Sequence, residues 1–370
     1  MMDGIAPPAS ELPRAETPEN ALLALARRAE QAGASDLHLH MRGDKAEVSF
    51  RLDGVMTAVG ELPAGLAERV VGRFKFLARL KTYQDSLPQD GRIDRKDIGT
   101  QHDVRVATYP TVTGEKIVLR LFSSKVVMRL DDLELPEAGQ AQLELFLGRT
   151  SGLMLLTGPA GSGKTTTIYS CLHHLVQTGG RQVITVEDPV EQVIPGIMQT
   201  EVNEARGLDF AKAARHLLRQ DPQVLVIGEI RDEETARLAV RAALTGHLII
   251  ATLHAGSCQG VFERLAVLCP DRSAVATSVE LVVNQRLLRR LCGDCAGAGC
   301  VRCLNSGYRG RLPLMEWLRV EETVRRQIAI QQLDGLRAKP ALRDHARKLL
   351  DAGLTDAREL SRVLGCDFAA

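Results

Sequence analysis

The chain has 370 residues, with 47 Lys or Arg against 46 Asp or Glu, and therefore a formal net charge of +1. At about 150 residues per domain, this length predicts two or three domains with large cores. A hydrophobic fraction of 45% and a charged fraction of 25% exclude a disordered chain. The near-zero charge and an aromatic fraction of 4% disfavour bulk electrostatic binding of nucleic acid and base stacking.

The amino terminus lacks the basic segment and apolar stretch of a signal peptide, and no apolar run approaches the roughly 20 residues that span a bilayer. We therefore expect a cytoplasmic protein. In that compartment its eight cysteines are more typical of metal ligands, reactive thiols or core residues than of disulfides. Four of them lie between Cys292 and Cys303.

The first third of the sequence predicts a tail followed by a small α+β domain. Residues 1–20 are rich in Pro, Ala and Glu, which is typical of a flexible tail, and residues 21–123 carry the domain. Helical or alternating periodicity predicts helices at 18–33 and 69–83, and strands at 36–40, 46–52, 103–109 and 116–122. Residues 124–136 are predicted as a linker.

Residues 137–370 are predicted as a second, α/β domain. Apolar runs predict strands at 153–157, 182–186, 224–227 and 248–252, with a helix starting at Gly163. Such alternation favours a parallel sheet with helices on both faces. The charged and amphipathic sequence after Cys303 predicts small helices through Leu364.

Residues 158–165 match the phosphate-loop pattern G-x-x-x-x-G-K-[ST] between a predicted strand and a predicted helix. Its glycines let backbone N–H groups close around phosphate oxygens, and the helix N-terminus favours negative charge. Lys164 should contact the β- and γ-phosphates, and Thr165 should ligate Mg²⁺. The predicted nucleotide contacts are Gly158, Pro159, Ala160, Gly161, Ser162, Gly163, Lys164, Thr165 and Thr166.

Acidic residues and histidines follow the other predicted strands. Glu187 and Glu229 end two of them, and carboxyl ends of parallel strands converge on one crevice, where carboxylates can hold Mg²⁺ or orient water. His254 lies at the carboxyl end of a third strand, where a γ-phosphate sensor would lie, and His247 lies at its other end. The alternatives are solvated or helix-capping carboxylates and structural histidines.

Together these motifs resemble those of the secretion ATPase superfamily, which contains the type II secretion and type IV pilus assembly ATPases. The matching boxes are GPAGSGKTTTIY at 158–169, ITVEDPVE at 184–191, RQDPQVLVIGEIRDEET at 219–235 and TGHLIIATLHAG at 245–256. Upstream, ASDLHLH, RLDGVM, LPQDGRI and DVRVATYPTVTGEKIVLRLF extend the resemblance to about residues 34–362.

The resemblance implies a RecA-like P-loop NTPase core with a parallel sheet, preceded by a smaller α+β (PAS-like) N-terminal domain. It implies a homo-hexameric, Mg²⁺-dependent ATPase, with ATP between the two domains of each subunit. Such a motor is cytoplasmic and peripheral to the inner membrane, where it acts on a platform protein in pilus or pseudopilus assembly or in type II secretion. The chain is expected to be a short form without the N-terminal docking domain of larger relatives.

The resemblance also implies roles for the residues that follow the strands. Glu187 would position the attacking water, and Glu229 would serve Mg²⁺ and its waters. His254 and His247 both match histidines of the family's site. The division of roles between the two glutamates stays open at this point.

Arginines of the first domain are further candidates, because phosphoryl transfer gains from an added guanidinium. Arg105 and Arg120 occupy places where the family presents arginines, and Arg92 is a third candidate. The alternative for each is a surface salt bridge. Many relatives carry basic residues just before LPQDGR, whereas this chain has Tyr-Gln-Asp-Ser at 83–86.

Two CxxC pairs, Cys292/Cys295 and Cys300/Cys303, have the spacing of a four-thiolate Zn²⁺ site. Assembly-type ATPases carry a tetracysteine element here, and NSGYRGR at 305–311 matches their flanking sequence. The pairs are separated only by residues 296–299, whereas relatives have a longer insertion. The remaining cysteines are predicted to be packing residues: Cys171, Cys258, Cys269 and Cys366.

Three alternatives remain open on the sequence. A pilus retraction motor shares the ATPase motifs, but retraction ATPases lack the tetracysteine element. A nucleic-acid translocase should be stimulated by DNA or RNA, and the balanced charge predicts no such partner. A non-hydrolysing scaffold should have a broken phosphate loop, whereas every motif residue is intact here.

Overall fold

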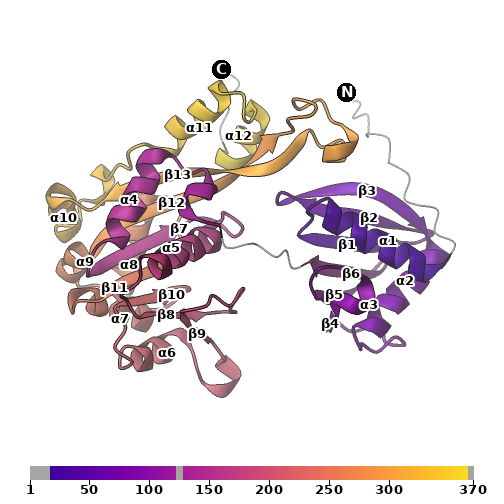
Figure 1. Cartoon of the computed structure of the whole chain (residues 1–370), viewed down its shortest axis with the longest axis horizontal. Coiled ribbons are helices and arrows are strands. Elements are labelled where there is room, and N and C mark those ends of the chain that lie inside the picture. The colour runs from indigo at the N-terminus through magenta and orange to yellow at the C-terminus, as the bar shows by residue number, and fades with distance from the viewer. Residues whose placement is uncertain (1–16, 122–127, 366–370) are drawn as a thin grey trace. The chain divides into compact units, whose positions relative to one another are not determined.

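A computed structural model describes residues 17–121 and 128–365 (Figure 1). By contacts the chain divides into two compact units, the first within 1–126 and 289–311 and the second within 127–288 and 312–370. Most of the predicted tail, the start of the predicted linker and Cys366 lie outside the described residues.

The first unit is built on a six-stranded sheet in the order β3-β2-β1-β6-β5-β4, and each pair of neighbouring strands is antiparallel. Alternating residues such as Leu37, Leu39 and Phe50 are fully buried beneath the helices of this unit. The strands are β1 (Asp36–Arg42), β2 (Lys45–Leu52), β3 (Val55–Pro63), β4 (Gln89–Ile93), β5 (Val104–Thr111) and β6 (Gly114–Leu121). The predicted N-terminal α+β domain is confirmed.

Helix α1 (Pro18–Gln31) is confirmed, and it begins where Thr17 accepts a hydrogen bond from the Asn20 amide, with proline in the first turn. The predicted helix at 69–83 was wrong in its bounds, because α2 runs from Ala64 to Leu77. The chain leaves α2 through Arg79, whose φ of 59° is left-handed. A short helix α3 (Arg95–Ile98) follows.

The buried Lys75 explains how the segment after α2 is held. Its ammonium lies 2.9 Å from Glu115 Oε1 and donates to the Gln84 carbonyl at 2.7 Å, and only 2% of its side chain is exposed. The loop is thereby attached to the helix and to β6.

Replacing Lys75 with methionine should lower the free energy of unfolding of the first unit by about 3 kcal/mol, because it leaves Glu115 buried without a counter-charge. Urea unfolding followed by circular dichroism measures the change. Lys45→Met is the matched control, because the Lys45–Glu61 pair is exposed and its loss should leave the transition nearly unchanged. Equal effects of both substitutions would contradict the prediction.

The second unit contains a seven-stranded sheet in the order β13-β12-β7-β11-β10-β8-β9. All pairs from β12 to β9 are parallel, which confirms the predicted α/β core. The strands are β7 (Gly152–Thr157), β8 (Val183–Glu187), β9 (Met198–Glu201), β10 (Val224–Ile227), β11 (Leu248–Thr252), β12 (Val279–Leu291) and β13 (Tyr308–Arg319).

Helices cover both faces of this sheet (Figure 1). One apolar cluster contains Leu143 and Leu172 of α4 and α5, and the other contains Ala239 and Phe262 of α7 and α8. The helices are α4 (Glu137–Leu147), α5 (Lys164–Thr178), α6 (Phe210–Leu217), α7 (Glu233–Leu244), α8 (Cys258–Leu268), α9 (Arg272–Ser278), α10 (Glu322–Ala329), α11 (Leu342–Asp351) and α12 (Ala357–Leu364). Within the described ranges, no helix combines the length and the apolar character needed to cross a bilayer.

The prediction of small helices alone after Cys303 was wrong, because β13 fills residues 308–319. Its residues 312–318 are all buried, Glu316 included, so the segment is a continuous buried run without the alternation of an amphipathic strand. Such a run does not distinguish a buried strand from a helix by periodicity.

Candidate active site

The phosphate loop, Glu187, Glu229 and His254 gather at one edge of the sheet of the second unit. Strands β7, β11, β10 and β8 are neighbours and parallel, so their carboxyl ends lie side by side. The phosphate loop follows β7, His254 follows β11, Glu229 follows β10, and Glu187 ends β8. This edge is where open α/β sheets bind ligands.

Two glycines of the phosphate loop lie where a side chain would clash with a neighbouring strand. Gly158 and Gly163 have φ values of 142° and 90°. A Cβ on Gly158 would lie 2.3 Å from the Gln285 carbonyl oxygen of β12, and one on Gly163 would lie 2.7 Å from the Gln285 amide nitrogen. The loop therefore lies directly against β12, a contact that the motif alone does not predict.

The polar groups of the loop suit an anionic ligand. The Lys164 ammonium donates to the carbonyls of Gly158 and Pro159 at 2.8 and 3.0 Å, and the buried Ser162 hydroxyl has no hydrogen-bond partner among the described residues. Burial lowers the pKa of Lys164, Glu229 opposes this and Arg286 adds to it. Helix α5 begins at Lys164, so its free N–H groups lie at the same place. A nucleotide phosphate fits this donor set.

Glu229 lies at the centre of a small ionic cluster. Its carboxylate lies 2.8 Å from His254 Nε2 and accepts from Arg231 Nε at 2.6 Å. Arg231 also lies 3.3 Å from Asp188, so it links the ends of β8 and β10. The hydrogen bond to Glu229 is the largest cause of the raised pKa of Arg231. Sequence reasoning missed Arg231, although it stands two residues from Glu229 within the matched box.

Glu187 is nearly buried, with 9% of the residue exposed. Its carboxylate accepts hydrogen bonds from Tyr169 Oη at 2.5 Å, Thr185 Oγ1 at 2.5 Å and Gln199 Nε2 at 3.0 Å. Sequence reasoning missed Tyr169 and Gln199. The sequence offered one signal for Tyr169, a polar hydroxyl on the helix that follows the phosphate loop.

His247 lies at the opposite end of β11 from His254. Its Nδ1 is 3.1 Å from the carbonyl oxygen of Ala242, near the end of α7. A strand of this length separates the two histidines by roughly 15 Å. Within the second unit, the structure therefore does not bring His247 to the phosphate loop.

The three candidate arginines of the first unit form one row across its sheet. Arg92 lies opposite Arg105, and Arg105 lies opposite Arg120. Arg120 donates to Asp36 at 3.1 Å while 67% of its side chain remains exposed. Burial raises the pKa of Asp36, but the hydrogen bonds from Arg120 and Ser35, together with the charges of Arg120 and Arg51, lower the pKa overall. Arg51, which the sequence did not single out, flanks Asp36 on the other side.

The four clustered cysteines meet at one point. Their Sγ atoms all lie within 4.8 Å of one another, with separations of 3.9 Å for Cys292–Cys300, 3.8 Å for Cys295–Cys303 and 3.7 Å for Cys300–Cys303. A tetrahedral Zn²⁺ with four bonds of about 2.3 Å requires sulfur separations of about 3.8 Å. The Gly299 amide also donates to Cys295 Sγ at 3.3 Å. The sulfur positions fit the metal, in spite of the short segment between the pairs.

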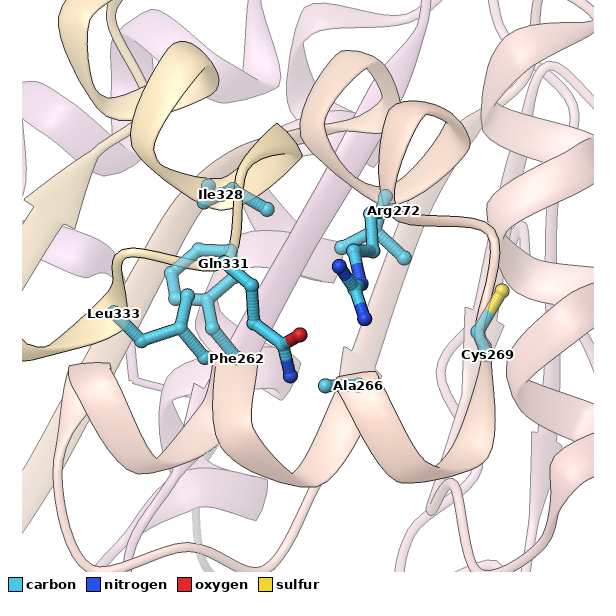
Figure 2. A pocket seen from close by; sticks show the side chains of 8 residues that line it. Phe262, Ala266, Cys269, Arg272, Ile328, Gln331 and Leu333 are labelled. Atoms are coloured by element: carbon cyan, nitrogen blue, oxygen red, sulfur yellow. The ribbon is translucent and has the colours of Figure 1, made fainter.

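A small pocket elsewhere in the second unit is not a substrate site (Figure 2). Its volume is about 10 Å³, which holds one water at most. Cys269 lies on its wall and is 3% exposed, in agreement with a packing role. The lining residues are Phe262, Ala266, Cys269, Arg272, Val275, Ile328, Gln331 and Leu333.

Comparison with known proteins identifies relatives over nearly the whole chain. The chain is 38% identical to type II secretion system protein E of Dickeya dadantii, over 89% of this chain and 72% of that protein. It is 36% identical to the type IV pilus assembly ATPase TfpB of Acinetobacter baylyi, over 90% of this chain and 63% of that protein.

Among solved structures, the pilus retraction motor PilT with bound ADP matches with a TM-score of 0.60 and 26% identity, over 92% of both chains. The family model described as type II/IV secretion system protein matches residues 15–362. This match contains both sheets, the phosphate loop, Glu187, Glu229 and the four cysteines. The chain belongs to the type II/IV secretion system protein family.

Proposed function

We propose that this chain is a Mg²⁺-dependent ATP hydrolase that powers type II secretion or pilus assembly. The proposal rests on one observation: four residues lie at the same edge of the parallel sheet, namely Lys164, Thr165, Glu187 and Glu229. The names of the relatives, a type II secretion protein E and a pilus assembly ATPase, support the process. As a member of this family, the chain is expected to act at the inner membrane without spanning it.

The residues of the edge divide the chemistry between phosphate binding and water activation. Lys164 and the first N–H groups of α5 bind the β- and γ-phosphates. Mg²⁺, when bound, neutralises developing charge on the phosphate oxygens. Thr165 and Glu229 would hold this metal ion and its waters, and His254 would fix the Glu229 carboxylate. Glu187 orients the attacking water, which suits a carboxylate that is held rigidly.

Arg105 and Arg120 are proposed to complete the site when the two domains close on ATP. The row with Arg92 supports this role, because it places three arginines side by side on neighbouring strands, and guanidinium groups bind phosphate oxygens well. Domain closure and opening would convert hydrolysis into motion. Closure of the two domains would not move His247 relative to the phosphate loop of its own unit, so the predicted nucleotide contact of His247 is not part of this proposal.

The direct test is ATP turnover by the purified chain with Mg²⁺ and with EDTA. We expect phosphate release with Mg²⁺, little release with EDTA, and no stimulation by DNA or RNA. Stimulation by nucleic acid would favour a translocase. Absence of turnover by folded protein that binds ATP would favour a scaffold.

A homo-hexamer is proposed as the working form, with an inner-membrane platform protein as its partner. Light scattering with and without ATP measures the mass of the assembly. A hexamer in either condition agrees with the proposal, and a monomer in both contradicts a self-sufficient ring.

The four cysteines are proposed to bind one Zn²⁺ per chain. Cys295→Ser should lower the zinc content of purified protein severalfold, because three thiolates bind the metal more weakly than four. Elemental analysis measures the content, and Cys171→Ser is the control because Cys171 lies buried away from the cluster. Zinc-free wild-type protein prepared in zinc-supplemented medium would contradict the site and would favour a retraction motor.

A further inference from the structure

Three side-chain donors from separate segments clamp the Glu187 carboxylate. Oε2 accepts from the Tyr169 hydroxyl of α5, and Oε1 accepts from Thr185 of β8 and from Gln199 of β9. A carboxylate has about four lone-pair sites, so three donors leave one place for a further hydrogen bond. This remaining place is on Oε2, because Oε1 already accepts two hydrogen bonds.

Tyr169 links Glu187 to the helix that binds phosphate. It lies five residues after Lys164 on α5, and its hydroxyl also accepts the Glu191 amide at 3.2 Å. Burial and the hydrogen bond to Glu187 both raise the pKa of Tyr169, so the phenol keeps its proton and remains a donor. A helix is rigid over this distance, and a shift of α5 on the phosphates therefore reaches Glu187 directly.

Gln199 supplies the second link. Its amide nitrogen donates to Glu187 and to the Gln192 carbonyl at 3.0 Å each, and its amide oxygen accepts from the Ile194 amide at 2.7 Å. One side chain thereby fixes both the carboxylate and the loop that follows β8.

We propose that Tyr169 and Gln199 are positioning residues for ATP hydrolysis, which hold Glu187 so that its last acceptor place faces the attacking water. This inference rests on the proposed function, because it takes Glu187 as the group that orients water. Neither residue is required to touch the nucleotide. Their loss should therefore affect the rate of hydrolysis and leave ATP binding unchanged.

The test is Tyr169→Phe in the full chain, which removes the hydroxyl and keeps the ring. We expect kcat to fall about tenfold, as for a lost hydrogen bond to a charged group, while KM for ATP stays within about twofold. Thermal unfolding checks that the fold is retained. Tyr83→Phe is the matched control, since Tyr83 is 83% exposed. Gln199→Met should reproduce the fall in kcat, and it decides the test if Tyr169→Phe does not fold.

A double-mutant cycle tests whether Tyr169 affects hydrolysis through Glu187 or independently of it. In the Glu187→Gln background, Tyr169→Phe should change the single-turnover rate by less than about twofold. The inference is overturned if Tyr169→Phe retains full kcat, if only its KM rises, or if the tenfold loss persists without the carboxylate. In each of these cases the proposed function still stands if the wild-type enzyme hydrolyses ATP and Glu187→Gln loses most of that activity.

Discussion

Lys164→Ala should abolish ATP turnover and weaken ATP binding while leaving the fold intact. The ammonium is the cation of the phosphate loop, and among the described residues it donates hydrogen bonds to the carbonyls of Gly158 and Pro159. Removing a charge-assisted contact to the phosphates should lower kcat/KM by at least about a hundredfold. The core is unaffected because the side chain does not belong to an apolar cluster.

Fluorescent ATP-analogue titration and phosphate release measure the two effects, and circular dichroism reports the fold. Lys96→Ala is the control, because Lys96 is an exposed lysine of the first unit. Retained turnover in a folded Lys164→Ala protein would contradict the assignment of the phosphate loop.

Glu187→Gln should behave differently, with ATP binding retained and hydrolysis lost. The amide keeps the size of the side chain but loses the negative charge that, in the proposed mechanism, orients the attacking water. Loss of such a group lowers kcat by about a thousandfold. The amide oxygen can still accept from one of the buried hydroxyls of Tyr169 and Thr185, and the other hydroxyl can turn to accept from the amide nitrogen, so the fold should remain stable.

The matched control is Glu322→Gln, an exposed carboxylate paired with Arg326 on α10. Glu229→Gln provides the comparison between the two acids. If Glu229 serves Mg²⁺, its variant should require more Mg²⁺ for half-maximal activity, whereas Glu187→Gln should not respond to added Mg²⁺. The reverse pattern would exchange the two roles.

Much of the second unit was predictable because its signals are local. The phosphate loop is a contiguous pattern, and the strands β7, β8, β10 and β11 are short apolar runs followed by polar residues. In a parallel sheet such strands end at one edge, so the gathering of Glu187, Glu229 and His254 followed from the order of motifs. The cysteine cluster was also predictable, because the spacing of its two CxxC pairs is a local signal.

Other parts depended on contacts that no local pattern records. Residues 312–318 of strand β13 are buried without alternation, so their pattern does not distinguish a strand from a helix. Helix α2 ends earlier than its periodicity suggests because the chain turns at Arg79. His247 stands in the matched histidine box, yet its strand carries it away from the loop. Sequence proximity to a motif therefore did not establish proximity to the site.

The sequence by itself determined that this protein carries a phosphate-loop pattern at a strand–loop–helix turn beside acidic strand ends, since the glycines, the lysine and the carboxylates are each identified from the sequence. Only the tertiary structure decided what surrounds those groups. Tyr169 and Gln199 reach Glu187 from 18 and 12 residues away, and Arg92, Arg105 and Arg120 align across three strands. Such contacts arise from packing and strand register, which depend on the whole fold.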